Sequence, residues 1–184
     1  EYAFQYLVDG TIRTGDPYSE KILDPWNDDD IPAINYPNLK PYPSGKTSQA
    51  VTVLQTMQSE YQWQITDFQK PPKEKLIIYE LHVRDFSTQR NYQFLIDTLS
   101  YLKSLGVNAI ELMPVNEFEG NSSWGYNPSF STALDKYYGT PNKLKEFIDL
   151  CHQNGIAVIM DIVLNHAYGQ SPLVSMYWDS ANSR

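Results

Sequence analysis

Polar, charged and aromatic side chains follow three short apolar runs of this sequence, at points where the strands of a parallel sheet would end. The residues concerned are His82, Arg84, Asp85, Asn116, Glu117, Trp124, Gly125, Tyr126, Asn127, Asp161, Asn165 and His166. Functional groups of parallel α/β proteins gather at the carboxyl ends of strands, because loops meet the sheet there. A sugar needs aromatic faces against its C–H surface and polar groups for its hydroxyls. The residues that supply this mixture are Trp124, Tyr126, Asn165 and His166.

Each of these positions also has a structural interpretation that the pattern leaves open. The Trp-Gly-Tyr cluster at 124–126 can be a packed turn, and His166 can be a strand-end histidine with its hydrogen bonds satisfied. For His82 a core position is favoured. Cys151 lies on the apolar face of a predicted helix, where a free cysteine behaves as a small core residue.

Asp161 is unusual because it stands inside an apolar run. Burying a carboxylate without partners costs several kcal/mol, so we expect hydrogen bonds to it from backbone amides or from an arginine such as Arg84. A structural role is favoured over a catalytic one.

The elements that would position these residues alternate between strand and helix. Apolar runs rich in β-formers predict strands at 76–83, 107–113 and 156–163. Leucines at helical spacing precede Gly106, and a second apolar helix face precedes Gly155, each glycine being followed at once by a strand. This register predicts an α/β fold with three parallel strands and right-handed crossovers.

The connection from Asn116 to Thr140 is about twice as long as a usual βα loop, and such loops tend to be functional or disordered. Its aromatic residues argue against disorder. At its end, Thr140 can cap a helix whose first position suits Pro141.

Residues 1–72 have a residue pattern that is typical of short strands and turns. Alternating side chains predict a strand over 2–8, Asp9-Gly10 predicts a hairpin turn, and further strands are expected at 12–17, 51–54 and 61–65. These few strands look incomplete as an independent β unit. Pro71-Pro72 marks the natural boundary between this region and the alternating strands and helices.

Composition excludes several classes of function. The net charge of −8 argues against a nucleic-acid partner, because neutralising phosphates requires a surplus of lysine and arginine. The sequence holds no membrane segment and no signal segment, and one cysteine with three histidines makes a zinc cluster improbable. Periplasmic, cell-surface and cytoplasmic locations are all compatible with this sequence.

Several segments match one known family in the correct order. They are Tyr79–Phe86, Gly106–Pro114, Trp124–Pro128, Tyr138–Thr140 and Asp161–His166. The last resembles the motif of an Asp followed by Asn-His that ends the third barrel strand of the α-amylase superfamily, glycoside hydrolase family 13. The agreement runs from about Lys75 to Tyr168. The residues of the first and third segments are similar to those of the branching-enzyme, pullulanase and isoamylase side of that superfamily.

The resemblance implies a specific architecture. Residues 73–184 would form the first three βα units of a partial (β/α)8 TIM barrel. Members on this side of the superfamily carry a β-sandwich before the barrel. Residues 1–72 are therefore expected to be a remnant of such a carbohydrate-binding-like sandwich, followed by a linker.

The resemblance also implies roles for individual residues. Tyr126 would stack on the glucose at the cleavage site, beside Trp124, and His166 would bond a hydroxyl of that sugar. Asp161 and Arg84 would shape the site. The implied ligand is an α-glucan or a maltooligosaccharide.

One further residue, Asn165, resembles a ligand of structural calcium in the superfamily. Calcium takes about six to eight oxygen ligands, and the family draws the others from downstream segments. No other cofactor is implied.

The family's retaining chemistry needs a nucleophile, an acid/base and a third aspartate from the fourth, fifth and seventh strands. The chain stops at Arg184, before all three. Retaining catalysis places two carboxyl groups about 5 to 5.5 Å apart, and no pair at a motif position here fills both roles. We therefore expect no catalytic residue in this chain and no activity from it alone, the starch-, glycogen- or pullulan-type activity lying in a longer parent.

Two alternatives stay open from the sequence. The chain could be a stand-alone carbohydrate-binding or interaction module without catalysis. It could also complete itself by self-association, because three parallel strands leave two open sheet edges. Specificity for α-1,4 or α-1,6 bonds, and hydrolysis or transfer, are not fixed by these residues.

Overall fold

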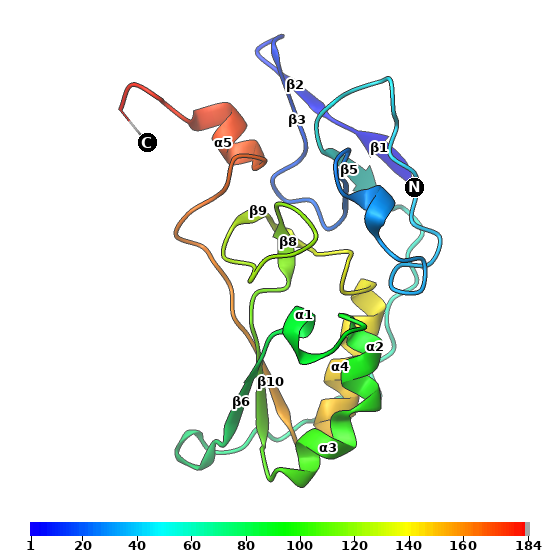
Figure 1. Ribbon diagram of the computed structural model, residues 1–184, viewed down its shortest axis with the longest axis vertical. Helices are drawn as coiled ribbons and strands as arrows, with labels where there is room; N and C mark the ends of the chain where they lie inside the picture. The colour runs from blue at the N-terminus through cyan, green and yellow to red at the C-terminus, as the bar shows by residue number, and fades with distance from the viewer. Residues whose placement is uncertain (183–184) are drawn as a thin grey trace.

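Three parallel strands lie at the centre of the part of the chain after residue 73. In the computed structural model, which describes residues 1–182, they pair in the order β10-β7-β6 (Figure 1). They are β6 (Ile78–Leu81), β7 (Ala109–Leu112) and β10 (Ala157–Met160). The three predicted parallel strands are confirmed, although each is shorter than its apolar run. At the carboxyl end β6 gives way to a helical turn at Val83, while the last sheet bond of β10 joins the Asp161 amide to the Leu112 carbonyl.

Four helices, α1 to α4, lie on one side of the three strands (Figure 1). The crossover from β6 to β7 contains α1 (Val83–Phe86), α2 (Tyr92–Asp97) and α3 (Leu99–Ser104). A continuous helix was expected over 95–102, but it breaks at Thr98, whose hydroxyl donates to the Phe94 carbonyl oxygen at 2.7 Å. Such local hydrogen bonds compete with helix continuation.

The longest helix is α4 (Pro141–Gln153), which precedes β10. Its predicted cap is confirmed, since the Thr140 hydroxyl oxygen accepts a hydrogen bond from the Lys143 amide and Pro141 occupies the first turn. The helix ends before Gly155, whose φ of +74° lies in the left-handed region that glycine tolerates.

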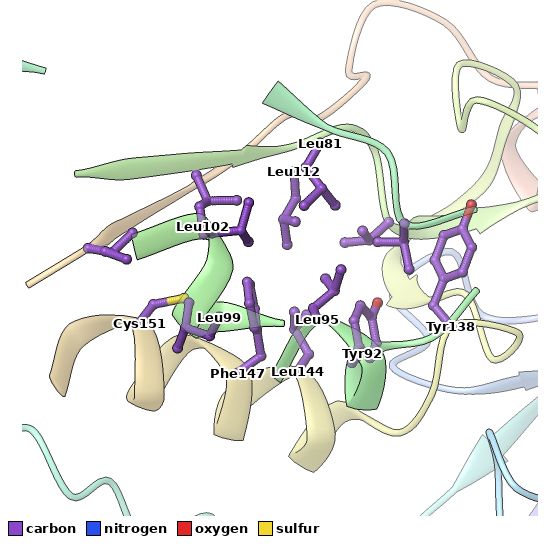
Figure 2. Packing of buried hydrophobic residues seen from close by; sticks show 14 of the residues in the cluster. Leu81, Tyr92, Leu95, Leu99, Leu102, Leu112, Tyr138, Leu144, Phe147 and Cys151 are labelled. Carbon is purple, nitrogen blue, oxygen red and sulfur yellow. The ribbon is translucent and has the colours of Figure 1, made fainter. Parts of the chain in front are cut away.

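The main core lies between these helices and the sheet (Figure 2). Figure 2 shows Leu95, Leu102 and Phe147 converging on Leu81 and Leu112 of the strands. Fully burying an aliphatic or aromatic side chain of this kind stabilises the fold by about 1.5–3 kcal/mol. The core position expected for Cys151 is confirmed, because its thiol is buried in this cluster.

The long connection after β7 is an ordered hairpin, which the sequence patterns did not predict. It consists of β8 (Asn116–Phe118) and β9 (Pro128–Leu134), which pair antiparallel with an irregular register. Residues 119–127 form its tip, and we call this segment the tip loop. The hairpin therefore presents Trp124 and Tyr126 from a fixed base.

The first 54 residues form two small antiparallel sheets. One contains β1 (Tyr2–Phe4), β5 (Val51–Leu54) and β4 (Ile22–Leu23), and the other pairs β2 (Tyr6–Val8) with β3 (Ile12–Thr14). The single strand expected over 2–8 is interrupted at Gln5, because β1 and β2 pair with different partners. The Asp9-Gly10 turn is confirmed, with φ values of +51° and +70°, the combination that a type I′ hairpin requires.

The strand predicted over 61–65 is wrong, because these residues join no ladder in the structure. They cross the outside of α4, where the amides of Gln64 and Ile65 donate to the Asp149 carboxylate at 2.8 and 2.9 Å. The Tyr61 hydroxyl donates to the same carboxylate at 3.2 Å. Their backbone groups are thus satisfied by a side chain instead of a sheet.

The remaining short elements are three. They are the 3-10 helices η1 (Asp28–Asp30) and η2 (Lys73–Lys75) and the helix α5 (Pro172–Tyr177). Among the described residues, no helix combines the length and the apolar character that a membrane span requires.

Asp149→Ala is expected to destabilise the chain by about 1–3 kcal/mol, because two backbone N–H groups and one hydroxyl lose their acceptor. Although burial acts against ionisation, these hydrogen bonds lower the pKa of Asp149. Denaturant unfolding measures the loss. The control is Asp97→Ala, which removes only an exposed helical contact to Gln93. Equal losses in the two variants would contradict the role given to Asp149.

Candidate functional site

The Tyr126 side chain in the tip loop is hydrogen-bonded to Asp161, which directly follows β10. Its hydroxyl donates to Asp161 Oδ2 at 2.7 Å. This hydrogen bond to a carboxylate, with partial burial, raises the pKa of Tyr126 to about 12, so the phenol stays a neutral donor. The expectation that Asp161 is hydrogen-bonded is confirmed. The prediction that its partners would be backbone amides or Arg84 is wrong, because the Tyr126 hydroxyl donates to its carboxylate instead.

His166 contacts the backbone of Tyr126. Its Nε2 lies 2.8 Å from the backbone carbonyl oxygen of Tyr126, and its Nδ1 lies 3.2 Å from Oδ1 of Asn165. Both ring nitrogens therefore face oxygens that accept hydrogen bonds, and a neutral imidazole donates to one of them. The structure thus brings together Tyr126, Asp161 and His166.

Gly125 allows the tip loop to approach the sheet. Its φ is +87°, and a Cβ at this position would lie 2.5 Å from the Pro114 carbonyl oxygen. The Gly125 amide donates to the Ser123 hydroxyl at 3.0 Å, and the Ser123 hydroxyl bonds to Asn127. The Trp-Gly-Tyr cluster is therefore a packed turn, as one interpretation of the sequence had it.

That turn also presents aromatic surface. Trp124 and Tyr126 are 60% and 40% exposed. A packed turn and a sugar-binding surface are therefore compatible in this cluster. A flat ligand could contact these rings, and the contribution of either residue to sugar binding stays a prediction.

Arg84 lies at the beginning of α1 and does not contact Asp161. Its guanidinium donates to both oxygens of Asp85, at 2.7 and 2.9 Å, and reaches the Ser122 hydroxyl at 3.5 Å. His82 Nδ1 lies 2.9 Å from Asp85 Oδ2. The Arg84 guanidinium, together with His82, holds the pKa of Asp85 well below its usual range. Arg84 thus links α1 to the tip loop, and His82 is buried as expected.

Asn165 is exposed and faces a small cavity together with His166. The side chains that line this cavity include Ser129, Ser131 and Ser171, and none of the lining residues is acidic. No group of three or more histidine, cysteine or acidic residues within residues 1–182 is arranged to hold a metal ion. Because calcium prefers several carboxylate or carbonyl oxygens, these side chains do not by themselves fit a calcium site.

Two candidates from the sequence lie away from the exposed rings. The Asn116 amide donates to the Ser131 carbonyl oxygen at 2.7 Å and so ties β8 to β9. Glu117 of β8 is a buried residue of the hairpin, and its Oε1 accepts a hydrogen bond from Lys136. The sequence reasoning missed Lys136 and its second partner, Asp28. One signal in the sequence could have indicated buried charges: Asp135 and Lys136 stand between Leu134 and two tyrosines.

Two further carboxylates lie on the sheet face opposite the helices. Glu80 of β6 and Glu111 of β7 are directly paired in register, one level below Leu81 and Leu112. They lie within the strands, whereas Tyr126 and His166 gather at the strand ends. Asp161, the carboxylate at that end, is already bonded to Tyr126.

Comparison with known proteins identifies the chain's relatives. Residues 85–182 match the model of the α-amylase catalytic domain. A malto-oligosyltrehalose trehalohydrolase from Saccharolobus solfataricus is 34% identical over 155 residues, which are 84% of this chain and 26% of the relative. A 1,4-α-glucan branching enzyme from Pseudoalteromonas atlantica is 33% identical over 180 residues, which are 90% of this chain and 24% of the relative.

A solved structure agrees with these relatives. A crystal structure titled as a putative α-amylase from Salmonella typhimurium superposes with a TM-score of 0.71 and 27% identity, over 95% of this chain and 26% of that one. The chain thus spans about a quarter of the length of the relatives it matches. Since the family model covers more than half of its residues, the chain belongs to the α-amylase catalytic-domain family.

Proposed function

We propose that this chain forms one wall of the sugar-binding site of a retaining α-glucan hydrolase or transferase. The observation that supports this most strongly is the connected set of Asp161, Tyr126 and His166 at the carboxyl ends of parallel strands. Asp161 orients the phenol ring, and His166 buttresses its backbone. The ring can then lie against the C–H face of a glucose unit while the exposed His166 imidazole bonds one of its hydroxyls.

The ligand class follows from the relatives and from the chemistry of this wall. The relatives' names state a malto-oligosyl and a 1,4-α-glucan substrate. Exposed rings at Trp124 and Tyr126 suit consecutive sugar units of such a chain. An α-glucan or maltooligosaccharide is therefore the ligand we assign to this surface.

The proposed architecture is the first three βα units of a (β/α)8 barrel over residues 73–184. The parallel order β10-β7-β6, with helices on one face and carboxylates on the other, supports it. Residues 1–72 are proposed as a sandwich remnant and linker. Their strands pair among themselves, and segments 16–36 and 61–65 bond to the hairpin and to α4.

The isolated chain is proposed to be inactive. Retaining hydrolysis needs one carboxylate free to attack and a second, protonated one about 5 to 5.5 Å away. Asp161 is engaged by Tyr126, Asp85 by Arg84, and Glu117 is buried with Lys136. A structural calcium in a longer parent remains a proposal that rests on Asn165 alone.

Tyr126→Ala is the direct test of the wall. We expect its affinity for maltohexaose, measured by calorimetry, to fall about two- to tenfold, because an aromatic face contributes about 0.5–1.5 kcal/mol beyond simple burial. The control is Tyr101→Ala, which removes an exposed tyrosine from α3, outside the tip loop. Unchanged affinity in Tyr126→Ala would contradict the assignment of this wall.

The same preparation separates the two classes of function. Incubation with starch and pullulan should release no reducing sugar. Release of sugar by the isolated chain would overturn its proposed inactivity. Maltohexaose binding by the isolated chain that is as tight as that of a longer parent, with no sugar released by either, would instead favour a binding module without catalysis.

A further inference from the structure

A buried cluster of charged residues lies under the hairpin that carries Tyr126. Lys136, just after β9, bonds to Glu117 Oε1 of β8 and lies 3.2 Å from Asp28 Oδ1 of η1. Asp135 is buried beside them, and its Oδ1 accepts the Tyr137 amide at 2.9 Å. The cluster thus joins three segments through one lysine.

The charges of this cluster do not balance. Three carboxyl groups face one ammonium group, and within residues 1–182 Glu117 Oε2 has no hydrogen-bond partner. The other titratable groups that face it bring no positive charge. Tyr92 and Tyr138 are phenols, and Asp24, whose amide donates to Asp28, is a further buried carboxyl group. If all three carboxyl groups were ionised, two buried negative charges would be uncompensated.

Proton uptake by a carboxyl group resolves this imbalance. Burial raises the pKa of both Glu117 and Asp135 well above their ordinary values. Burial also raises the pKa of Asp28, despite the nearby lysine. Although burial alone would lower the pKa of Lys136, its carboxyl neighbours raise it, so the lysine stays charged.

The cluster is continuous with the tip loop. Glu117 and Phe118 lead directly into residues 119–127. The loop is fastened to the same part of the amino-terminal region a second time, because the Asn121 amide donates to the Asn27 carbonyl oxygen at 2.7 Å, next to Asp28. The Thr132 hydroxyl of β9 also donates to the Ser19 carbonyl oxygen at 2.8 Å, so the hairpin meets the amino-terminal region at Asn121, Thr132 and Lys136.

We propose that Glu117 is a positioning residue, whose bound proton keeps the hairpin docked on η1 and thereby holds the tip loop, with Tyr126, in place for the sugar. The role of Tyr126 in sugar binding rests on the proposed function, whereas the docking of the hairpin on η1 is independent of it. The proton is exchanged with solvent, and Glu117 touches no substrate.

The direction of the pH dependence follows from the two states of the hairpin. In the open state Glu117 is solvated and titrates near its ordinary pKa of about 4.3, whereas in the docked state burial raises its pKa well above that value. Between these values the docked state binds the extra proton. Docking is therefore strongest at the acidic end of this window and weakens by up to about tenfold per pH unit as pH rises.

Hydrogen exchange of the full chain at pH 5.5 and 7.5 tests the proposal without a sugar. After correction for intrinsic exchange, protection of residues 119–127 should fall about tenfold or more in the native chain at the higher pH. In Glu117→Gln, which keeps an acceptor for Lys136 but cannot ionise, the fall should be about tenfold smaller. Amides of α4 are the internal reference, and Glu146→Gln, at an exposed pair with Lys143, is the matched control.

The same fall in protection in Glu117→Gln as in the native chain would overturn the proposal. If Glu117→Gln does not fold, Asp28→Asn provides the second variant, and it should loosen the tip loop at both pH values. Maltohexaose affinity measured at the same two pH values separates the two proposals. Correct exchange results with no sugar binding would support docking and count against the proposed function, whereas binding that is independent of pH would overturn the positioning role.

Discussion

Gly125→Ala is expected to destabilise the chain by about 3 kcal/mol or more, combining left-handed backbone strain with steric overlap. The added Cβ would lie 2.5 Å from the Pro114 carbonyl oxygen and 2.7 Å from the Pro114 Cβ, and neither can move easily because Pro114 directly precedes the hairpin. The tip loop must then lift from the strand end. We expect maltohexaose binding at Tyr126 to be lost together with the stability.

Gly120→Ala is a matched control for this change. Gly120 lies in the same tip loop with a φ of +84°, almost that of Gly125, but its added Cβ would meet nothing within 4 Å. It should therefore show the backbone strain alone, about 1–2 kcal/mol. Denaturant unfolding of both variants measures the difference. Similar losses in the two would mean that close approach to Pro114 is not what fixes the turn.

The parallel strands and their helices could be predicted because their signals are local. Apolar runs, the Thr140 cap and the glycines after each helix each specify one element, and they agree with one another. The strand predicted at 61–65 failed for the opposite reason. Its extended backbone is held by Asp149, which is distant in sequence, and no local pattern reveals such a partner.

The site shows the same division between local and distant signals. Motif order placed Tyr126, Asp161 and His166 at neighbouring strand ends, where the structure brings them together. The partner of Asp161 was mistaken. Arg84 follows β6, two strands away from β10, and donates to its own neighbour Asp85, whereas Tyr126 follows the adjacent strand β7. The buried cluster could not be predicted, since Asp28 and Lys136 are joined only when the amino-terminal region packs on the hairpin.

This cluster leads to the second large prediction. Lys136→Met is expected to cost about 3–5 kcal/mol, because it leaves buried carboxyl groups without their only cation among the described residues. The loss should be smaller at pH 5 than at pH 8. Without the ammonium group the carboxyl groups retain protons to higher pH in the folded state, and acid supplies those protons at less cost. Urea unfolding at the two pH values measures both effects.

Lys143→Met is the control for Lys136→Met, because Lys143 pairs with Glu146 on the surface of α4, where an ion pair contributes about 0.5 kcal/mol or less. Combining Lys136→Met with Glu117→Gln and Asp28→Asn should recover part of the lost stability, since neutral amides replace the unpaired charges. A further loss in the combined variant would mean that Lys136 acts by packing its aliphatic chain. In that case the charge balance of the cluster would not be what docks the hairpin.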